Sequence, residues 1–158
     1  MRAEEIEILL VEDNSADAEL TLHALRESTY VSRIHVLRDG EQALNFIFCK
    51  APYEERAGQP LPQLILLDLK LPKVDGLSVL RTLKEDRRTR WMPVIVLSSS
   101  KEDSDLTTSY DLGANSYIQK PVEFDRFREM VHSLAQYWLH LNQSPLRQTM
   151  PNRTEKFA

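Results

Sequence analysis

The fold is decided by one stretch of sequence, Leu64-Ile65-Leu66-Leu67-Asp68-Leu69-Lys70-Leu71-Pro72. Its first four residues form a short, wholly apolar run, which is typical of a strand buried on both faces of a sheet. The run ends at a carboxylate, Asp68, and Pro72 and Asp75-Gly76 then mark the connection to the next element. The stretch therefore predicts a buried strand of a parallel sheet, with an acidic side chain at its carboxyl end.

Similar patterns recur on both sides of this stretch. Four further segments read as strands: Ile6 to Val11, Arg33 to Leu37, Val94 to Leu97 and Asn115 to Gln119. Helical patterns alternate with them, and these cover Asn14 or Ser15 to Ser28, Glu41 to Cys49, a segment with Val79, Leu80 and Leu83, Glu102 to Leu112, and a last helix from about Phe124 to Leu141. Right-handed crossovers place such helices on both faces of one sheet. We therefore predict an α/β fold with a doubly wound, five-stranded parallel sheet.

The length and composition favour one domain. The chain has 158 residues, of which 42% are hydrophobic and 28% charged, enough for a single hydrophobic core. We predict a domain over residues 1–141 and a polar tail over residues 142–158, which is too short for a core of its own. Residues Lys50 to Pro62 contain three prolines and are predicted to form a long surface loop.

Hydropathy and charge limit the partners of this chain. The longest apolar stretches fall far short of the roughly 18 residues that a membrane-spanning helix needs, and the first residues lack the apolar core of a signal peptide. The formal net charge of −4 argues against a nucleic-acid partner, since such proteins usually carry a basic face. We therefore expect a cytoplasmic protein that binds neither membrane nor nucleic acid.

Polar side chains stand where the predicted strands end. They are Glu12 and Asp13 after the first strand, Asp68 after the third, Ser98 after the fourth and Lys120 after the fifth. The carboxyl ends of parallel strands form one edge of a sheet, where ligands bind in folds of this class, so the five side chains should meet. Three converging carboxylates repel one another, which raises at least one pKa or recruits a cation. Mg²⁺ suits such a site because it needs few protein oxygens and keeps several waters.

Four groups of residues together resemble the receiver domain of two-component response regulators. They are Leu10-Val11-Glu12-Asp13-Asn14, Leu66 to Pro72 with Asp75-Gly76, Pro93-Val94-Ile95 with Ser98, and Gly113-Ala114 with Tyr117 to Pro121. The resemblance covers the chain up to about Leu141 and implies a flavodoxin-like sheet of strand order 2-1-3-4-5. It also implies a phosphoacceptor signalling protein and not an enzyme in the ordinary sense, although such a domain catalyses its own Mg²⁺-dependent phosphotransfer and dephosphorylation.

The same resemblance assigns a role to the residues at this edge. Asp68 is implied as the nucleophile that takes a phosphoryl group from a phosphohistidine, while Mg²⁺ and Lys120 supply positive charge. Asp13, Asp68 and the carbonyl of Lys70 are implied as direct ligands of Mg²⁺. Glu12 is implied to act nearby or through water.

Readout of phosphorylation is implied to involve two further residues. Ser98 would offer its hydroxyl to a phosphoryl oxygen, and Tyr117 would swing inward behind it, changing the surface formed by the last strand and the helices beside it. Tyr117 can also be read as an ordinary half-buried strand residue. Pro121 is implied to follow a cis peptide bond that fixes the direction of Lys120.

The last predicted helix carries Tyr137, Trp138 and Leu141 two or more turns beyond the part that should pack on the sheet. Exposed apolar side chains of this kind tend to mark an interface, so we predict a homodimer that uses this end. The alternative is that the helix remains over the core or folds against the tail.

A narrower resemblance links the chain to the stand-alone response regulators that partner bacterial phytochromes. It depends on the opening strings, the proline-bearing insertion before Leu64 and the Tyr137-Trp138 and Leu141 ending. It implies a bacteriophytochrome histidine kinase as the phosphoryl donor. A phosphorelay through a downstream phosphotransfer protein is compatible with this scheme.

Three other functions compete with this interpretation. A receiver-fold adaptor that is never phosphorylated would not need the complete set of acids, hydroxyl and lysine. A phosphatase with a nucleophilic aspartate normally needs a second acid two residues later, where this chain has Lys70. A DNA-binding regulator needs a folded helical module, which the short tail with Arg147, Arg153 and Lys156 does not provide.

Overall fold

The computed structural model describes residues 8–30 and 33–145. Within these residues the strands are β1 (Ile8–Val11), β2 (Ile34–Leu37), β3 (Leu64–Leu67), β4 (Val94–Ser98) and β5 (Ser116–Gln119). They form one parallel sheet in the order β2-β1-β3-β4-β5. The predicted doubly wound sheet and its strand order are confirmed.

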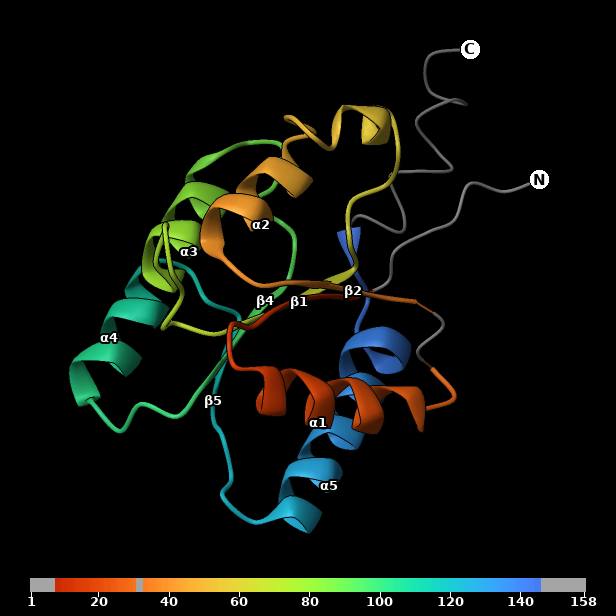
Figure 1. Cartoon of the computed structure of the whole chain (residues 1–158), viewed down its shortest axis with the longest axis vertical. Helices are drawn as coiled ribbons and strands as arrows, with labels where there is room; N and C mark the ends of the chain where they lie inside the picture. Colours follow the sequence, from red (N-terminus) through yellow and green to blue (C-terminus); the bar gives the residue numbers. More distant parts are fainter. Residues whose placement is uncertain (1–7, 31–32, 146–158) are drawn as a thin grey trace.

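Helices cover both faces of this sheet. They are α1 (Ser15–Arg26), α2 (Gly40–Ile47), α3 (Gly76–Glu85), α4 (Asp103–Asp111) and α5 (Phe124–Ala135), with a short 3₁₀ turn η1 (Glu54–Arg56) and a π-helical extension η2 (Gln136–Leu141). Figure 1 shows α1 and α5 on one side of the sheet and α2, α3 and α4 on the other. Two helical layers therefore enclose the strands.

Alternate strand residues feed two hydrophobic cores, one under each helical layer. In β1, Leu9 and Val11 pack toward α2 and α3, whereas Ile8 and Leu10 pack toward α1 and α5. All of β1 and β3 is buried, which explains why these strands are continuous apolar runs without polar alternation. The first polar side chain after each strand is therefore the one that reaches the edge of the sheet.

Short polar residues start three of the helices. The side chains of Asn14, Asp39 and Asp75 each accept a hydrogen bond from the backbone N–H three residues later, at 3.0, 2.7 and 2.9 Å. Such caps satisfy N–H groups that have no partner within the helix. Each helix therefore begins close to the carboxyl end of the sheet.

The predicted surface loop before β3 has more structure than its prolines suggested. It contains η1, whose Arg56 lies with its guanidinium carbon 3.6 Å from the centre of the Phe46 ring and donates to the Phe46 carbonyl at 3.0 Å. Tyr53 packs edge-on against the same ring. A cation over an aromatic face is stabilising, and this contact anchors the loop to α2.

Some predictions fall on parts of the chain that the structure does not describe. Residues 6 and 7 of the first predicted strand lie outside the described residues, as do Arg147, Arg153 and Lys156 of the predicted tail. The division at residue 141 therefore stays a prediction. Among the described residues, no helix is both long and apolar enough to cross a bilayer. The cytoplasmic location also stays a prediction.

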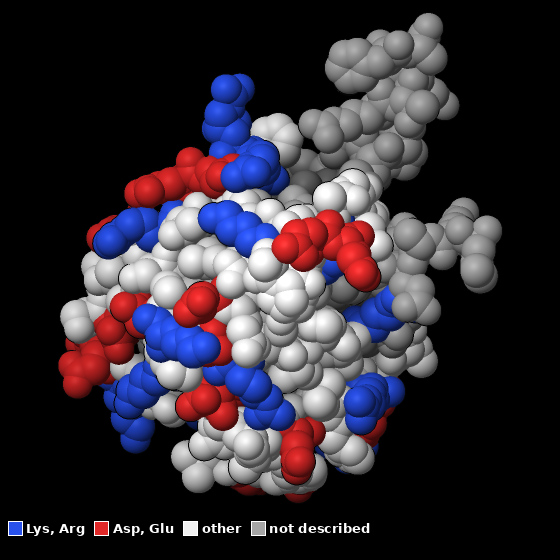
Figure 2. Space-filling view, turned by 45° about the horizontal axis from the view of Figure 1, so that its top comes forward, with Lys and Arg blue, Asp and Glu red and all other residues white. Residues whose placement is uncertain are grey.

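Charged residues of both signs are interspersed over the face drawn in Figure 2. This distribution fits a protein that has 20 basic and 24 acidic residues and therefore a net charge of −4. The prediction that the chain has no nucleic-acid partner is not tested by it.

The extension η2 continues α5 past the edge of the core. Leu139 is buried and Trp138 packs partly on the core beneath α1 and α5, while His140 stacks on Tyr30 at 4.6 Å between ring centres. Tyr137 and Leu141 remain 49% and 56% exposed. The extension thus stays partly over the core and also presents apolar side chains to solvent.

Candidate functional site

Strand register brings the predicted site residues to one edge of the sheet. Val11 of β1 is paired with Leu67 of β3, so Glu12 and Asp68 leave neighbouring strands side by side. At β5 the backbone N–H of Lys120 donates to the carbonyl of Ser98 at 2.7 Å. The convergence expected from the strand ends is therefore a consequence of this register.

Asp68 is a buried carboxylate whose two oxygens differ in their surroundings. Oδ1 accepts hydrogen bonds from the backbone N–H groups of Leu69 at 2.7 Å and Lys70 at 3.4 Å. Oδ2 faces the ammonium of Lys120, with 3.4 Å between Oδ2 and Nζ. One oxygen is thus held by the backbone, and the other is directed into the site.

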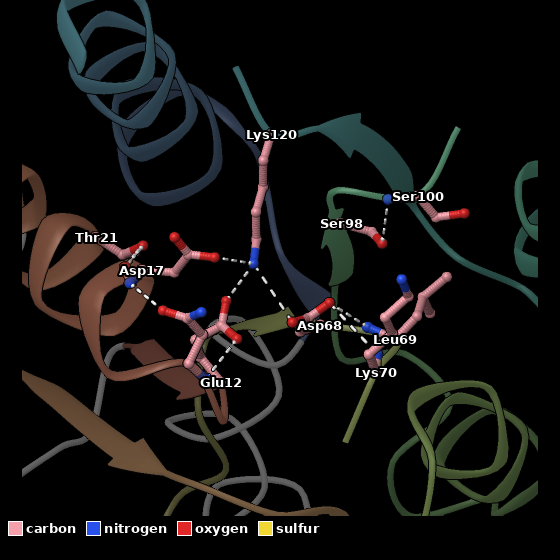
Figure 3. A network of polar contacts seen from close by, with 10 residues as sticks. Glu12, Asp17, Thr21, Asp68, Leu69, Lys70, Ser98, Ser100 and Lys120 are labelled. Atoms are coloured by element: carbon pink, nitrogen blue, oxygen red, sulfur yellow. Dashed lines mark hydrogen bonds and ion pairs between the residues drawn. The ribbon is translucent and has the colours of Figure 1, made fainter. Parts of the chain in front are cut away.

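Lys120 reaches into the centre of the site and contacts three carboxylates (Figure 3). Its Nζ donates to Glu12 Oε1 in the shortest of these contacts, to Asp17 Oδ2 at 2.9 Å and to Asp68 Oδ2 at 3.4 Å. Burial disfavours its charge, but the carboxylates of Glu12, Asp17 and Asp68 outweigh that effect and raise the pKa of Lys120 above its ordinary value. The lysine is therefore a positively charged group at this edge.

Glu12 shows that one lysine is not enough for this group of acids. Burial and, after it, the neighbouring Asp68 carboxyl raise the pKa of Glu12 to about 7, although Lys120 acts in the opposite direction. The ammonium of Lys120 is shared among three carboxylates, so its effect on Glu12 alone is incomplete. The predicted repulsion between the acids thus contributes to the raised pKa of Glu12, but less than burial does.

The donor set fits a hard divalent cation by its chemistry. Glu12, Asp17 and Asp68 surround a single positive charge, and Asp13 adds a further carboxylate next to Glu12 in the chain. Among the described residues, no three acidic, His or Cys side chains stand in an arrangement ready to hold a metal ion. Lys120 lies between the carboxylates instead. Cation binding would therefore require the lysine to give up part of its present position.

Two of the predicted metal ligands lie at the margin of the network. Asp13 is exposed, and it is not one of the three carboxylates that contact Lys120. Lys70 has an exposed side chain and contributes its backbone N–H to Asp68 Oδ1. Their roles as ligands stay predictions.

Ser98 begins a chain of hydroxyl contacts that leads to α4. Its Oγ accepts from the backbone N–H of Ser100 at 3.1 Å, and Ser98 is completely buried. The Ser100 hydroxyl donates to Asp105 on α4 and accepts from the backbone N–H of Glu102 at 3.2 Å. A displacement of Ser98 would therefore reach the first turn of α4.

Tyr117 packs its ring against the core beneath α2 and α3, where its hydroxyl is buried without a hydrogen-bond partner among the described residues. The hydroxyl of Ser109 on α4 is also buried without a hydrogen-bond partner among the described residues. Unpaired buried hydroxyls are costly, so these groups favour any rearrangement that gives them partners. The switching role of Tyr117 stays a prediction.

The expected cis peptide bond before Pro121 is wrong. Within the described residues the cis bond joins Ala51 to Pro52. The two isomers of a bond before proline differ by only about 0.5–1 kcal/mol in the absence of tertiary contacts, so sequence alone does not choose between them.

Asp17 is the site residue that the sequence analysis missed. It is the third residue of α1, whose cap Asn14 follows closely on β1. A helix that starts so near the end of a strand must place its first turn over the same edge of the sheet. A search of that turn for charged residues would have found Asp17.

Gly76 determines where the Asp68 backbone can lie. A Cβ atom at Gly76 would stand 2.3 Å from the Asp68 carbonyl oxygen and 2.5 Å from Leu69 Cα. We expect Gly76→Ala to displace the segment that carries Asp68, to destabilise the fold by about 1–3 kcal/mol and to slow the phosphorylation that the resemblance to receiver domains implies for Asp68. Urea unfolding and labelling with acetyl phosphate measure the two effects.

Gly58→Ala is the matched comparison for this prediction. Gly58 has φ of +86°, and a Cβ there would meet nothing within 4 Å. Its replacement should cost about 1 kcal/mol through the backbone alone and leave labelling unchanged. Equal losses of labelling in the two variants would contradict the role given to Gly76.

The class of this protein is defined by a doubly wound sheet and four polar positions at one edge of it. These are acids after the first and third strands, a hydroxyl on the last residue of the fourth and a lysine after the fifth. A family model described as "Response regulator receiver domain" matches residues 8–132. The chain belongs to this family and is a receiver-domain protein of two-component signalling.

Curated relatives cover most of the chain. It is 44% identical over 138 residues to the "Probable methanogenesis regulatory protein FilR2" of Methanothrix harundinacea, covering 87% of this chain and 86% of the relative. It is 39% identical over 132 residues to response regulator Rcp1 of Synechocystis, covering 84% and 88%. Both relatives are of similar length to this chain.

Solved structures of phytochrome-associated regulators have the same fold. The phosphorylated cyanobacterial phytochrome response regulator RcpA is 38% identical with a TM-score of 0.83, covering 90% of this chain and 99% of RcpA. The Mn²⁺-bound form of Rcp1 is 38% identical with a TM-score of 0.82, covering 89% and 99%. The bacteriophytochrome response regulator AtBRR is 44% identical with a TM-score of 0.71, covering 90% and 97%.

Proposed function

We propose that this protein is a single-domain response regulator that accepts a phosphoryl group on Asp68 from a histidine kinase, with Mg²⁺ bound beside it. The observation that carries the proposal is the environment of Asp68. Backbone N–H groups hold its Oδ1, and a charged lysine faces its Oδ2. An adaptor that is never phosphorylated would have no use for this arrangement.

In the proposed transfer, an oxygen of Asp68 forms a bond to phosphorus while the bond from phosphorus to the histidine nitrogen of the kinase breaks. The electron pair of the broken bond leaves with the imidazole, and the product on Asp68 is an acyl phosphate. The protein contributes mainly alignment and neutralisation of charge on the phosphoryl oxygens. Lys120 is placed to supply part of that neutralisation.

Mg²⁺ would be held by Asp13, Asp68 and the Lys70 carbonyl, with Glu12 beside it. A bound divalent cation supplies Lewis-acid stabilisation of the phosphoryl oxygens and offsets the surplus of carboxylates. The raised pKa of Glu12 supports this assignment, and so does the Mn²⁺-bound form of the relative Rcp1.

Acceptance of phosphate is tested by intact-mass measurement after incubation with acetyl phosphate and Mg²⁺. We expect the mass to rise by one phosphoryl group and the labelling to disappear when EDTA is added first. An unchanged mass, both with acetyl phosphate and with phosphorylated kinases, would contradict the proposal.

The hydroxyl chain from Ser98 supports a route for readout. When Asp68 carries a phosphoryl group, Ser98 would donate to one of its oxygens and loosen its contact with Ser100. The change would pass through Ser100 to Asp105 on α4, and Tyr117 would adjust behind it. The surface of α4, β5 and α5 is then the face on which partners detect phosphorylation.

We further propose a bacteriophytochrome histidine kinase as the donor. RcpA and AtBRR, which match this chain over about nine-tenths of its length, are described as phytochrome or bacteriophytochrome response regulators. FilR2, whose sequence is 44% identical to this chain, is named for methanogenesis. A transfer assay is therefore needed to decide which kinase is the phosphoryl donor. Transfer from a set of autophosphorylated kinases should be fastest with a bacteriophytochrome, and a faster transfer from another class would overturn this assignment.

A downstream phosphotransfer protein would appear in the same assay as an acceptor of label from Asp68.

We also propose a homodimer formed through Tyr137, Trp138 and Leu141. Tyr137 and Leu141 are about half exposed and lie near each other on η2, while Trp138 also packs on the protein's own core. Leu141→Ser should therefore raise the dimer dissociation constant by about tenfold or more without loss of the core, as measured by sedimentation.

Tyr110→Ser is the control for the dimer, since Tyr110 is 50% exposed on α4 and lies outside η2. It should leave sedimentation unchanged. A dimer that dissociates in Tyr110→Ser and persists in Leu141→Ser would place the interface on α4 instead.

A further inference from the structure

A carboxylate outside the expected site holds the central lysine. Lys120 Nζ lies 2.9 Å from Asp17 Oδ2 but 3.4 Å from Asp68 Oδ2. We propose that Asp17 competes with the acceptor aspartate for Lys120 and thereby weakens the hold of the site on a phosphoryl group. Asp17 would be a positioning residue, and this inference rests on the proposed function of Asp68.

The number of donors on Lys120 makes the competition direct. A lysine ammonium has three N–H donors, and here three carboxylates accept from it. A phosphoryl group on Asp68 can take over the donor that now serves Asp68 Oδ2, but at 3.4 Å this is the longest of the three contacts. A close contact with a phosphoryl oxygen therefore requires Lys120 to move away from Glu12 or Asp17.

The burial of Glu12 and of Asp17 indicates which of these two carboxylates releases Lys120. The Glu12 side chain is 2% exposed, so water cannot replace Lys120 there, and release of the lysine from this buried carboxylate is costly. The Asp17 side chain is 32% exposed, so water can replace the lysine there at much lower cost. The exchange should therefore take place at Asp17, and the strength of that contact opposes phosphoryl binding.

The backbone of Asp17 is fixed by hydrogen bonds, and its carboxylate is partly exposed to solvent. Its N–H donates to Asn14 Oδ1 at 3.0 Å, and its carbonyl accepts from Thr21 Oγ1 at 2.7 Å. Figure 3 shows the side chain directed from α1 toward Lys120. The amino end of a helix is a favourable place for a carboxylate, so Asp17 can lose the lysine without moving α1.

The first test measures the contact in the unphosphorylated protein. Urea midpoints in EDTA are compared for Asp17→Asn, Lys120→Met, the double variant and the parent chain. Asp17→Asn should lower the urea midpoint more, or raise it less, in the chain that has Lys120 than in the Lys120→Met chain. Equal changes in both backgrounds would show that the two side chains are not coupled and would overturn the inference.

The second test measures the effect on a phosphoryl analogue. Beryllium fluoride is titrated with Mg²⁺ in excess and binding is followed by fluorine NMR. Asp17→Asn should bind the analogue about two- to fivefold more tightly than the parent, the range expected for a partly exposed ion pair. Asp17→Glu should return the affinity toward the parent value, which a merely structural role would not produce.

Glu19→Gln is the matched control, because it removes the same charge from an exposed position on α1. It should leave the affinity for beryllium fluoride unchanged. If the parent binds the analogue and Asp17→Asn behaves like Glu19→Gln, or binds more weakly than the parent, the inference is overturned while the function of Asp68 stands. If the parent does not bind at all, the proposed function is overturned, and the inference falls with it.

Discussion

Asp68→Asn is expected to abolish phosphoryl acceptance, with a loss of at least about a thousandfold in the rate of labelling. The substitution removes the proposed nucleophile, the oxygen that faces Lys120, and changes almost nothing in size. The side-chain oxygen of Asn can still accept from the backbone N–H of Leu69, which now donates to Asp68 Oδ1 at 2.7 Å. Intact-mass measurement with acetyl phosphate and Mg²⁺ provides the readout.

The fold should survive this substitution. Asp68 is one of the groups that raise the pKa of Glu12, so its neutralisation relieves repulsion at the site. Asp111→Asn, at an exposed position at the end of α4, is the control and should label like the parent protein. Labelling of Asp68→Asn at the parent rate would mean that phosphate goes elsewhere on the chain.

Lys120→Met is expected to destabilise the metal-free protein by about 3 kcal/mol, because removal of one partner leaves buried charges without compensation. The value lies at the low end of the usual range, since Asp17 and Asp68 keep side-chain exposures of 32% and 11%. Mg²⁺ should recover part of the loss, because a divalent cation can take the place of the ammonium. Urea unfolding in EDTA and in excess Mg²⁺ measures both quantities.

The stabilisation gained from Mg²⁺ should be larger in Lys120→Met than in the parent, where the lysine and the cation compete for the same carboxylates. Lys50→Met is the matched control, as Lys50 is exposed beyond the end of α2. It should show the parent response to Mg²⁺. If Lys120→Met gained no more than the parent, the carboxylates around Lys120 would not be the cation site.

The sheet and most of the site residues could be predicted because their signals are local. The apolar run Leu64 to Leu67 has the length and composition of a doubly buried strand, and the first polar residue after such a strand must lie at the sheet edge. Glu12 and Asp68 were found in this way. Their proximity then follows from the pairing of Val11 with Leu67.

Other features could not be predicted because they depend on contacts between distant parts of the chain. Arg56 was placed in a plain loop, yet it covers the ring of Phe46. The peptide bond before Pro121 was expected to be cis and is not. In both cases the local preference is weak, and packing decides the outcome.

The sequence by itself determined the strands, their helical crossovers and the polar residues at the strand ends, because hydrophobic periodicity and turn residues act over a few positions. Only the tertiary structure decided how one lysine is divided among its carboxylates. Lys120 is 108 residues from Glu12 and 103 from Asp17 in the chain, so their contacts follow from packing around the site. Burial of Glu12 and the first turn of α1 over the sheet edge set that balance, and neither is visible in the order of residues.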